Sequence, residues 1–236
     1  IDSLTLACDA LTCNANGSID QLGGPRNMTL KGNVDYDMAK VAVLLRPYVG
    51  DHVQLVGKEK QSFSLSGPLT TPENSPPGTL ESTLGGRLEG ATAVGWESGN
   101  LYGFRLGRGN MNAQLGRGRL AVSALDLPLS GGRLNANPLF VLAPGTAEMY
   151  LDPGPLLTRV NISPEMCRNS LMYIAPVFAN VAQAQGSFSI DMSGCRGPLA
   201  TPAQGDLAGQ FTIHDVQITG GPLIQELGVL LQRPSA

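Results

Sequence analysis

The sequence predicts an α+β protein rich in β structure, with a curved antiparallel sheet, two or three amphipathic helices packed on its apolar face, and an internal duplication. Three observations predict this class: closely spaced turn residues, apolar alternation with period two, and apolar residues at helical spacing. The 236 residues include 30 glycines and 17 prolines. These do not gather into a low-complexity linker, so they mark turns between many short strands.

Strands are predicted wherever apolar residues alternate with small or polar ones, because side chains of a strand point to opposite faces in turn. Such strands bury one face only. Two or three helices are too few to cover a long sheet, so we expect an apolar groove. The predicted strands include Leu4–Leu6, Met28–Leu30, Phe63–Leu65, Leu120–Val122, Phe188–Met192 and Phe211–Ile213.

Three segments carry apolar residues at helical spacing. Asp35 and Asp37 precede the first segment and suit helix capping, and Ser163 before Pro164 is a good N-cap for the second. The apolar positions are Met38, Val41, Leu44 and Leu45 in the first, Met166, Leu171, Ile174, Phe178 and Val181 in the second, and Leu223, Ile224, Leu227, Leu230 and Leu231 in the third.

An internal duplication is predicted from landmarks that recur in the same order. Ser62–Ser64 recurs as Ser187–Ser189, and Gly67–Leu69 recurs as Gly197–Leu199. Each copy reads as a helix, then strands, then a Gly-Pro turn. The predicted units are residues 1–100 and 101–236, sharing one core.

Four cysteines favour two disulfides over a metal site, because no Cys-x-x-Cys pair is present. A helix from Cys167 to about residue 183 and a returning strand to Cys195 would span roughly 24 and 30 Å, bringing these two together. Cys8 and Cys13 would pair across a local turn. Disulfides would place the chain in an oxidising compartment; the alternative is four buried free thiols.

The net charge and the lengths of the apolar runs exclude some classes of function. A net charge of −3 gives no pull toward polyanions, so no nucleic-acid partner is expected. No apolar run reaches the roughly 18 residues of a membrane span. Because the chain begins with Ile1 and not Met, we expect that a signal peptide or membrane anchor precedes it in the full-length protein.

No catalytic constellation is recognisable, so we expect no enzyme, metal or cofactor. Gly95–Gly99 lacks the spacing of a nucleophile elbow and reads as a turn. His52 and His214 read as ordinary histidines, one on the first helix and one on a late strand.

Four arginines beside glycine-rich turns are candidates for binding a phosphate or lipid headgroup. A hairpin with solvated arginines explains the same residues. The four are Arg105, Arg108, Arg117 and Arg119.

The Leu-x-Leu strands, the Gly-Arg-Leu turns and the stretch Leu125–Asn135 resemble the AsmA-like and TamB-like proteins of bacterial envelopes. The resemblance implies a periplasmic piece of a membrane-anchored protein, whose apolar β groove carries lipid toward the outer membrane. It implies no catalytic residue. A lipid or another apolar ligand is therefore the expected partner.

The candidate lining of this groove alternates along the strands, with two aromatic residues from the helix above. Each strand position reads equally well as ordinary core, because groove and core need the same period. The alternative function is a structural or protein-interaction domain of the envelope with a closed core. The candidate lining is Phe63, Leu65, Tyr173, Phe178, Phe188, Ile190, Phe211 and Ile213.

Overall fold

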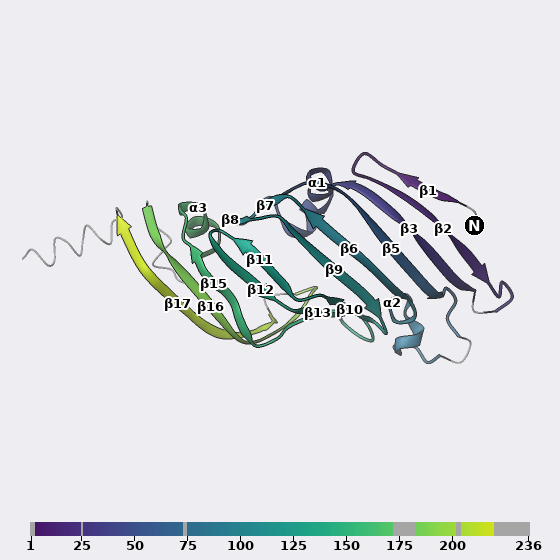
Figure 1. Cartoon of the computed structure of the whole chain (residues 1–236). Helices are drawn as coiled ribbons and strands as arrows, with labels where there is room; N and C mark the ends of the chain where they lie inside the picture. The colour runs from purple at the N-terminus through teal and green to yellow at the C-terminus, as the bar shows by residue number, and fades with distance from the viewer. Residues whose placement is uncertain (1–2, 25, 73–74, 172–182, 202–203, 220–236) are drawn as a thin grey trace, which may run out of the picture.

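The computed structural model describes residues 3–24, 26–72, 75–171, 183–201 and 204–219. Its strands form one antiparallel sheet with few helices, which confirms the predicted β-rich class (Figure 1). The strands are β1 (Leu4–Ala7), β2 (Leu11–Asp20), β3 (Asn27–Asp37), β4 (Val53–Val56), β5 (Lys58–Pro68), β6 (Glu89–Trp96), β7 (Ser98–Leu101), β8 (Phe104–Leu106), β9 (Gly109–Gly116), β10 (Arg119–Val122), β11 (Leu125–Leu129), β12 (Gly132–Ala136), β13 (Pro138–Val141), β14 (Glu148–Leu151), β15 (Gly154–Asn161), β16 (Gln183–Pro198) and β17 (Asp206–Thr219).

The sheet is a meander in which most long strands are broken in the middle. β4, β7, β8, β11, β12 and β15 pair in that order as one set of half-strands. β5, β6, β9, β10, β13 and β14 pair as the other set. The unbroken β16 joins both sets, because its first half pairs with β15 and its second half with β14. Antiparallel neighbours joined by short turns explain this topology.

The break between β4 and β5 depends on a glycine. Gly57 has φ +146°, and a Cβ there would lie 2.8 Å from the backbone nitrogen of Glu97. Glu97 is itself the break between β6 and β7, and its N–H donates to the Val56 carbonyl at 2.8 Å. Two neighbouring strands therefore bend at the same place, where only glycine permits the close approach.

The pairing register sorts side chains onto two faces, because directly opposed residues share a face. One face, here called the apolar face, carries Leu30, Leu65, Leu115, Leu120 and Phe140 in neighbouring strands. The opposite face, here called the polar face, carries residues such as Asn14, Asn33 and Ser62. All the strands predicted from alternation are present.

The helices are α1 (Met38–Val49), α2 (Leu84–Arg87) and α3 (Pro164–Met166), with a 3-10 turn η1 (Leu80–Ser82) and a π turn η2 (Cys167–Leu171). α1 and α3 lie at one end of the strands and α2 at the other (Figure 1). Two of the three predicted capping residues are confirmed: the Asp37 carboxylate accepts from the Ala39 N–H, and the Ser163 hydroxyl accepts from the Met166 N–H. Asp35 does not cap the helix; it lies inside β3, 3.5 Å from Lys60.

The predicted apolar side of the first helix is only partly right. Met38 and Ala42 are buried, but Leu44 and Leu45 are 57% and 43% exposed. The first turns of α1 pack on the sheet, so its later apolar residues find no surface to cover. The third predicted helix, from Pro222, lies outside the described residues.

The prediction of two disulfides is wrong, because all four cysteines are free. In the β1–β2 hairpin Leu6 faces Cys13, and the Cys8 N–H donates to the Leu11 carbonyl. Cys8 is thus diagonal to Cys13, with Cα atoms about 7–8 Å apart, at or beyond disulfide reach.

The second pair fails because β16 runs away from Cys167 and does not return toward it. Ile162 donates to the Gly186 carbonyl, so the start of β16 lies beside the segment that leads into α3. From Gly186 to Cys195 the strand advances about 30 Å.

The predicted landmarks of the duplication lie in two long strands. Phe63 lies in β5, which follows α1 and the short strand β4, and Phe188 lies in β16, which comes after α3 and η2. Both strands end at a Gly-Pro pair, Gly67–Pro68 and Gly197–Pro198. The duplication and its boundary stay predictions, since the boundary near residue 100 falls inside β7, within a single sheet.

Candidate functional site: the apolar face of the sheet

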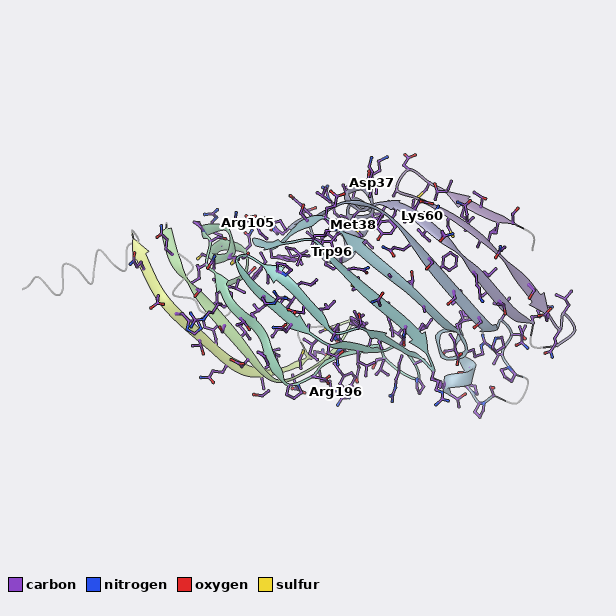
Figure 2. The ribbon with its side chains drawn as sticks, in the orientation of Figure 1. Asp37, Met38, Lys60, Trp96, Arg105 and Arg196 are labelled. Atoms are coloured by element: carbon purple, nitrogen blue, oxygen red, sulfur yellow. The ribbon has the colours of Figure 1, made fainter. Side chains whose placement is uncertain are left out.

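One end of the apolar face is closely packed. Val160, Met166, Cys167, Leu171 and Phe188 are 0% exposed. They come from β15, β16, α3 and η2, so the turns after β15 cover the sheet here. This region is here called the covered half. Its cluster extends through Leu127 and Trp96 to Met38 at the start of α1 (Figure 2).

Aromatic contacts fix the centre of the covered half. The Phe188 ring lies 5.2 Å from the Phe211 ring and 6.3 Å from the Phe104 ring, the latter edge-on. Trp96 donates its indole N–H to the Gly107 carbonyl at 2.9 Å. Packed aromatic rings and a hydrogen-bonded indole N–H are typical of a protein core.

The rest of the apolar face, here called the open half, is only partly buried. Its apolar side chains are neither fully exposed nor buried, although they alternate as regularly as those of the covered half. The described helices lie at the ends of the strands and not over their centres (Figure 1). The open half consists of Leu30, Phe63, Leu65, Leu115, Leu120, Phe140 and Met149.

The structure divides the candidate lining residues between these regions. Phe188, Ile190 and Phe211 belong to the covered half, where they are core or pack against it. Phe63 and Leu65 belong to the open half. Ile213 is 40% exposed on β17. Tyr173 and Phe178 lie outside the described residues.

The four candidate arginines do not form one cluster. Arg105 and Arg108 lie in and just after β8, whereas Arg117 and Arg119 lie at the opposite end of β9. Arg108 is 3.6 Å from a carboxylate oxygen of Glu59, and is therefore already paired. Arg117 and Arg119 line a hollow of about 440 Å³ with Leu80, Val141 and Ala143. Arg105 lines a separate hollow of about 430 Å³ with Leu106, Leu129 and Ile162.

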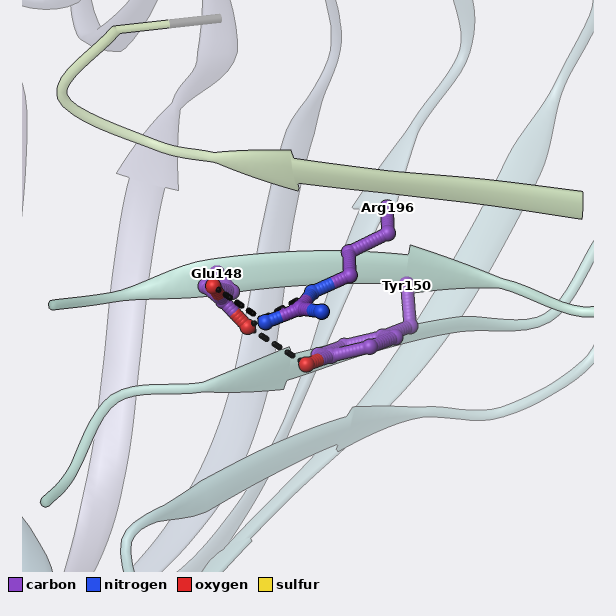
Figure 3. A network of polar contacts seen from close by, with 3 residues as sticks. All are labelled: Glu148, Tyr150 and Arg196. Atoms are coloured by element: carbon purple, nitrogen blue, oxygen red, sulfur yellow. Dashed lines mark hydrogen bonds and ion pairs between the residues drawn. The ribbon is translucent and has the colours of Figure 1, made fainter. Parts of the chain in front are cut away.

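A polar network that sequence reasoning missed joins β14 to β16 (Figure 3). Arg196 donates two hydrogen bonds to the Glu148 carboxylate, at 3.0 and 3.2 Å, and the Tyr150 hydroxyl donates to the same carboxylate. The Arg196 guanidinium also lies 5.8 Å from the centre of the Tyr150 ring. Glu148 and Tyr150 at spacing two signal a shared face, but only the pairing of β14 with β16 identifies the arginine.

The network shifts the acidity of its members. The hydrogen bonds from Arg196 and then Tyr150 lower the pKa of Glu148 below its ordinary value, because they favour the charged carboxylate. The bond to Glu148 raises the pKa of Tyr150. Both side chains remain in contact with solvent, so the pairing is worth little energy.

Other polar groups offer little chemistry within the described part of the chain. The Ser189 hydroxyl and the His214 Nε2 are 3.0 Å apart, and the same hydroxyl accepts from the Arg159 N–H. No group of three or more metal-ligating side chains converges among the described residues. The helices described are too short to cross a membrane.

Searches of family models, curated proteins and solved structures found no match to this chain.

Proposed function

We propose that this chain is a non-enzymatic periplasmic module of a membrane-anchored envelope protein, and that its open half binds the acyl chains of a lipid. One observation carries the proposal: apolar side chains from neighbouring strands, such as Leu65, Leu115 and Leu120, remain partly exposed on one continuous face. A large apolar patch that stays exposed on a folded protein is typical of a binding site.

The resemblance to AsmA-like and TamB-like proteins supports the same ligand class. In those proteins, lipid is carried on an apolar surface of a curved β structure, and the partners lie in the envelope. We expect Arg117, in the turn after β9 and beside Leu80, to contact a lipid phosphate from the rim of the sheet.

A second candidate function is a structural or protein-interaction domain. It is favoured by α1, where Val43, Leu44 and Leu45 form an exposed apolar row, 43–57% accessible. Leu45 follows Met38 and Ala42 on the packed side of the helix, but it lies beyond the turns that pack on the sheet. A partner protein, and not a lipid in the sheet, would then be the ligand.

Native mass spectrometry after incubation with phosphatidylethanolamine and phosphatidylglycerol vesicles distinguishes these functions. We expect phospholipid to bind at a defined ratio. A Leu65→Gln Leu120→Gln variant should lose affinity by about tenfold or more, because burial of each leucine side chain by an acyl chain contributes about 1.5 kcal/mol to binding.

The matched control is Leu44→Gln, which changes an exposed leucine on α1 and should bind lipid normally. Absence of lipid, or equal loss in both variants, would contradict the proposal. Protein partners captured by the native chain and lost only in Leu44→Gln would favour the second candidate.

A further inference from the structure

The polar face of the sheet contains a hollow that is separate from the apolar face. It measures about 870 Å³ and crosses the middle of β2, β3, β5, β6 and β9. On each of these strands three consecutive residues line it, such as Asn14–Asn16 and Ser62–Ser64. Because side chains alternate, the outer two of each triplet project into the hollow and the middle one contributes its backbone to the floor.

The side chains form two rows that run across the strands. Asn14, Asn33 and Ser62 stand opposite one another in one row, with Asn112 farther along. Asn16, Lys31, Ser64, Ala91 and Gln114 stand opposite one another in the second row. Five strands at about 4.8 Å spacing give a trough about 19 Å long.

The lining of this polar trough is mostly uncharged. Among the described residues that line it, Lys31 is the one charged residue and none is acidic. Two acids farther along β3 are paired with lysines: Asp35 lies 3.5 Å from Lys60, and Asp37 lies 3.8 Å from Lys58. Amides and hydroxyls thus supply most of its hydrogen-bonding groups.

These groups are available to a ligand. Among the described residues, the side chains of Asn16, Asn33 and Gln114 have no hydrogen-bond partner, and all three are exposed. An amide donates through its nitrogen and accepts through its oxygen, and a hydroxyl does both, so the rows complement a ligand that is rich in hydroxyls. Ala91 in the second row and Ala93 in the first have short side chains, which leave room for the ring of such a ligand.

We propose that the polar trough binds an extended carbohydrate chain. A peptide fits less well, because the backbone groups in the floor already pair within the sheet and the lining offers no apolar pocket for side chains. A nucleic acid fits less well, because a single lysine cannot neutralise several phosphates.

A second feature lies on the line of the trough. The row that contains Gln114 continues through Ala121 and Leu139 to Tyr150, each directly opposite the next. Tyr150 carries Arg196 over its ring. The face of the Tyr150 ring that Arg196 does not cover offers a stacking surface for a longer chain.

The test uses the neutral chains cellohexaose, chitohexaose and maltohexaose, with two-dimensional NMR of the side-chain amide groups. We expect at least one of these to shift the amide signals of Asn33 and Asn112. An Asn33→Ala Asn112→Ala variant should weaken binding about tenfold. Thr29→Ala, an exposed change on the same face outside the lining, should leave binding unchanged.

The two faces give independent results, so failure here leaves the lipid proposal intact. The carbohydrate proposal is overturned if none of the three probes shifts these signals, or if binding survives in the double variant. Exposed asparagines at these positions hold no contact that folding needs, and the urea midpoint of both variants should match that of the native chain.

Discussion

The covered half and the open half of the apolar face share one sequence pattern and differ in burial. Leu157, Val160 and Phe188 are 0–7% exposed, whereas Leu30, Leu65 and Leu120 lie on the same face and keep partial contact with solvent. The difference arises from what covers the strands: α3 and η2 pack on one region, and no described helix covers the other. Alternation specifies which residues share a face, but only the covering elements decide whether that face is core or surface.

The largest expected effect compares two phenylalanines that occupy matching landmarks. Phe188→Ala should lower the free energy of unfolding by about 3–5 kcal/mol, because it empties a fully buried site among aromatic rings. Phe63→Ala should cost only about 1–2 kcal/mol, since its side chain is half-buried. Urea unfolding followed by tryptophan fluorescence at Trp96 measures both.

Equal losses at the two positions would break the comparison and indicate that the open half is as well packed as the covered half. A lipid-binding measurement extends the comparison of the two halves: Phe63→Ala should reduce lipid association without unfolding the chain.

The next largest expected effect is a difference in stability between alanine variants of two glycines of β9. A Cβ at Gly109 would lie 2.5 Å from the Trp96 ring and 2.7 Å from Leu127, so Gly109→Ala should destabilise the chain by about 1–3 kcal/mol. A Cβ at Gly116 would meet nothing within 4 Å, so Gly116→Ala should change stability by less than about 0.5 kcal/mol.

Circular dichroism melts of the two glycine variants suffice for this measurement. A neutral Gly109→Ala would mean that the Trp96 ring can move aside, and that this edge of the covered half is loosely packed.

Local chemistry in the sequence predicted local structure well. Alternation located the strands, and the Asp37 and Ser163 caps were predicted because capping depends on adjacent residues. Gly95–Gly99 was wrongly interpreted as a turn. It is the end of β6, a one-residue break and the start of β7, so Trp96 enters the core.

Features that depend on distant pairing were not predictable in the same way. The direction of β16 relative to α3 decides that Cys167 and Cys195 stay apart, and no local signal encodes it. The two rows of the polar trough likewise require the register of five strands. Asn14, Asn33 and Asn112 are ordinary surface residues until that register brings them to one place.

The smallest expected effect concerns the polar network that links β14 to β16. Because the folded pKa of Glu148 lies below its ordinary value of 4.5, the network stabilises the fold above about pH 4.5 and loses this contribution as the pH falls through the folded pKa. Glu148→Gln should therefore slightly lower the urea midpoint at pH 7, and this difference should shrink at pH 3. The matched control is Glu97→Gln at an exposed position, which should leave the pH 7 midpoint unchanged. A midpoint difference between native chain and Glu148→Gln that persists undiminished at pH 3 would assign the effect to packing of the Tyr150 ring, and not to the carboxylate charge.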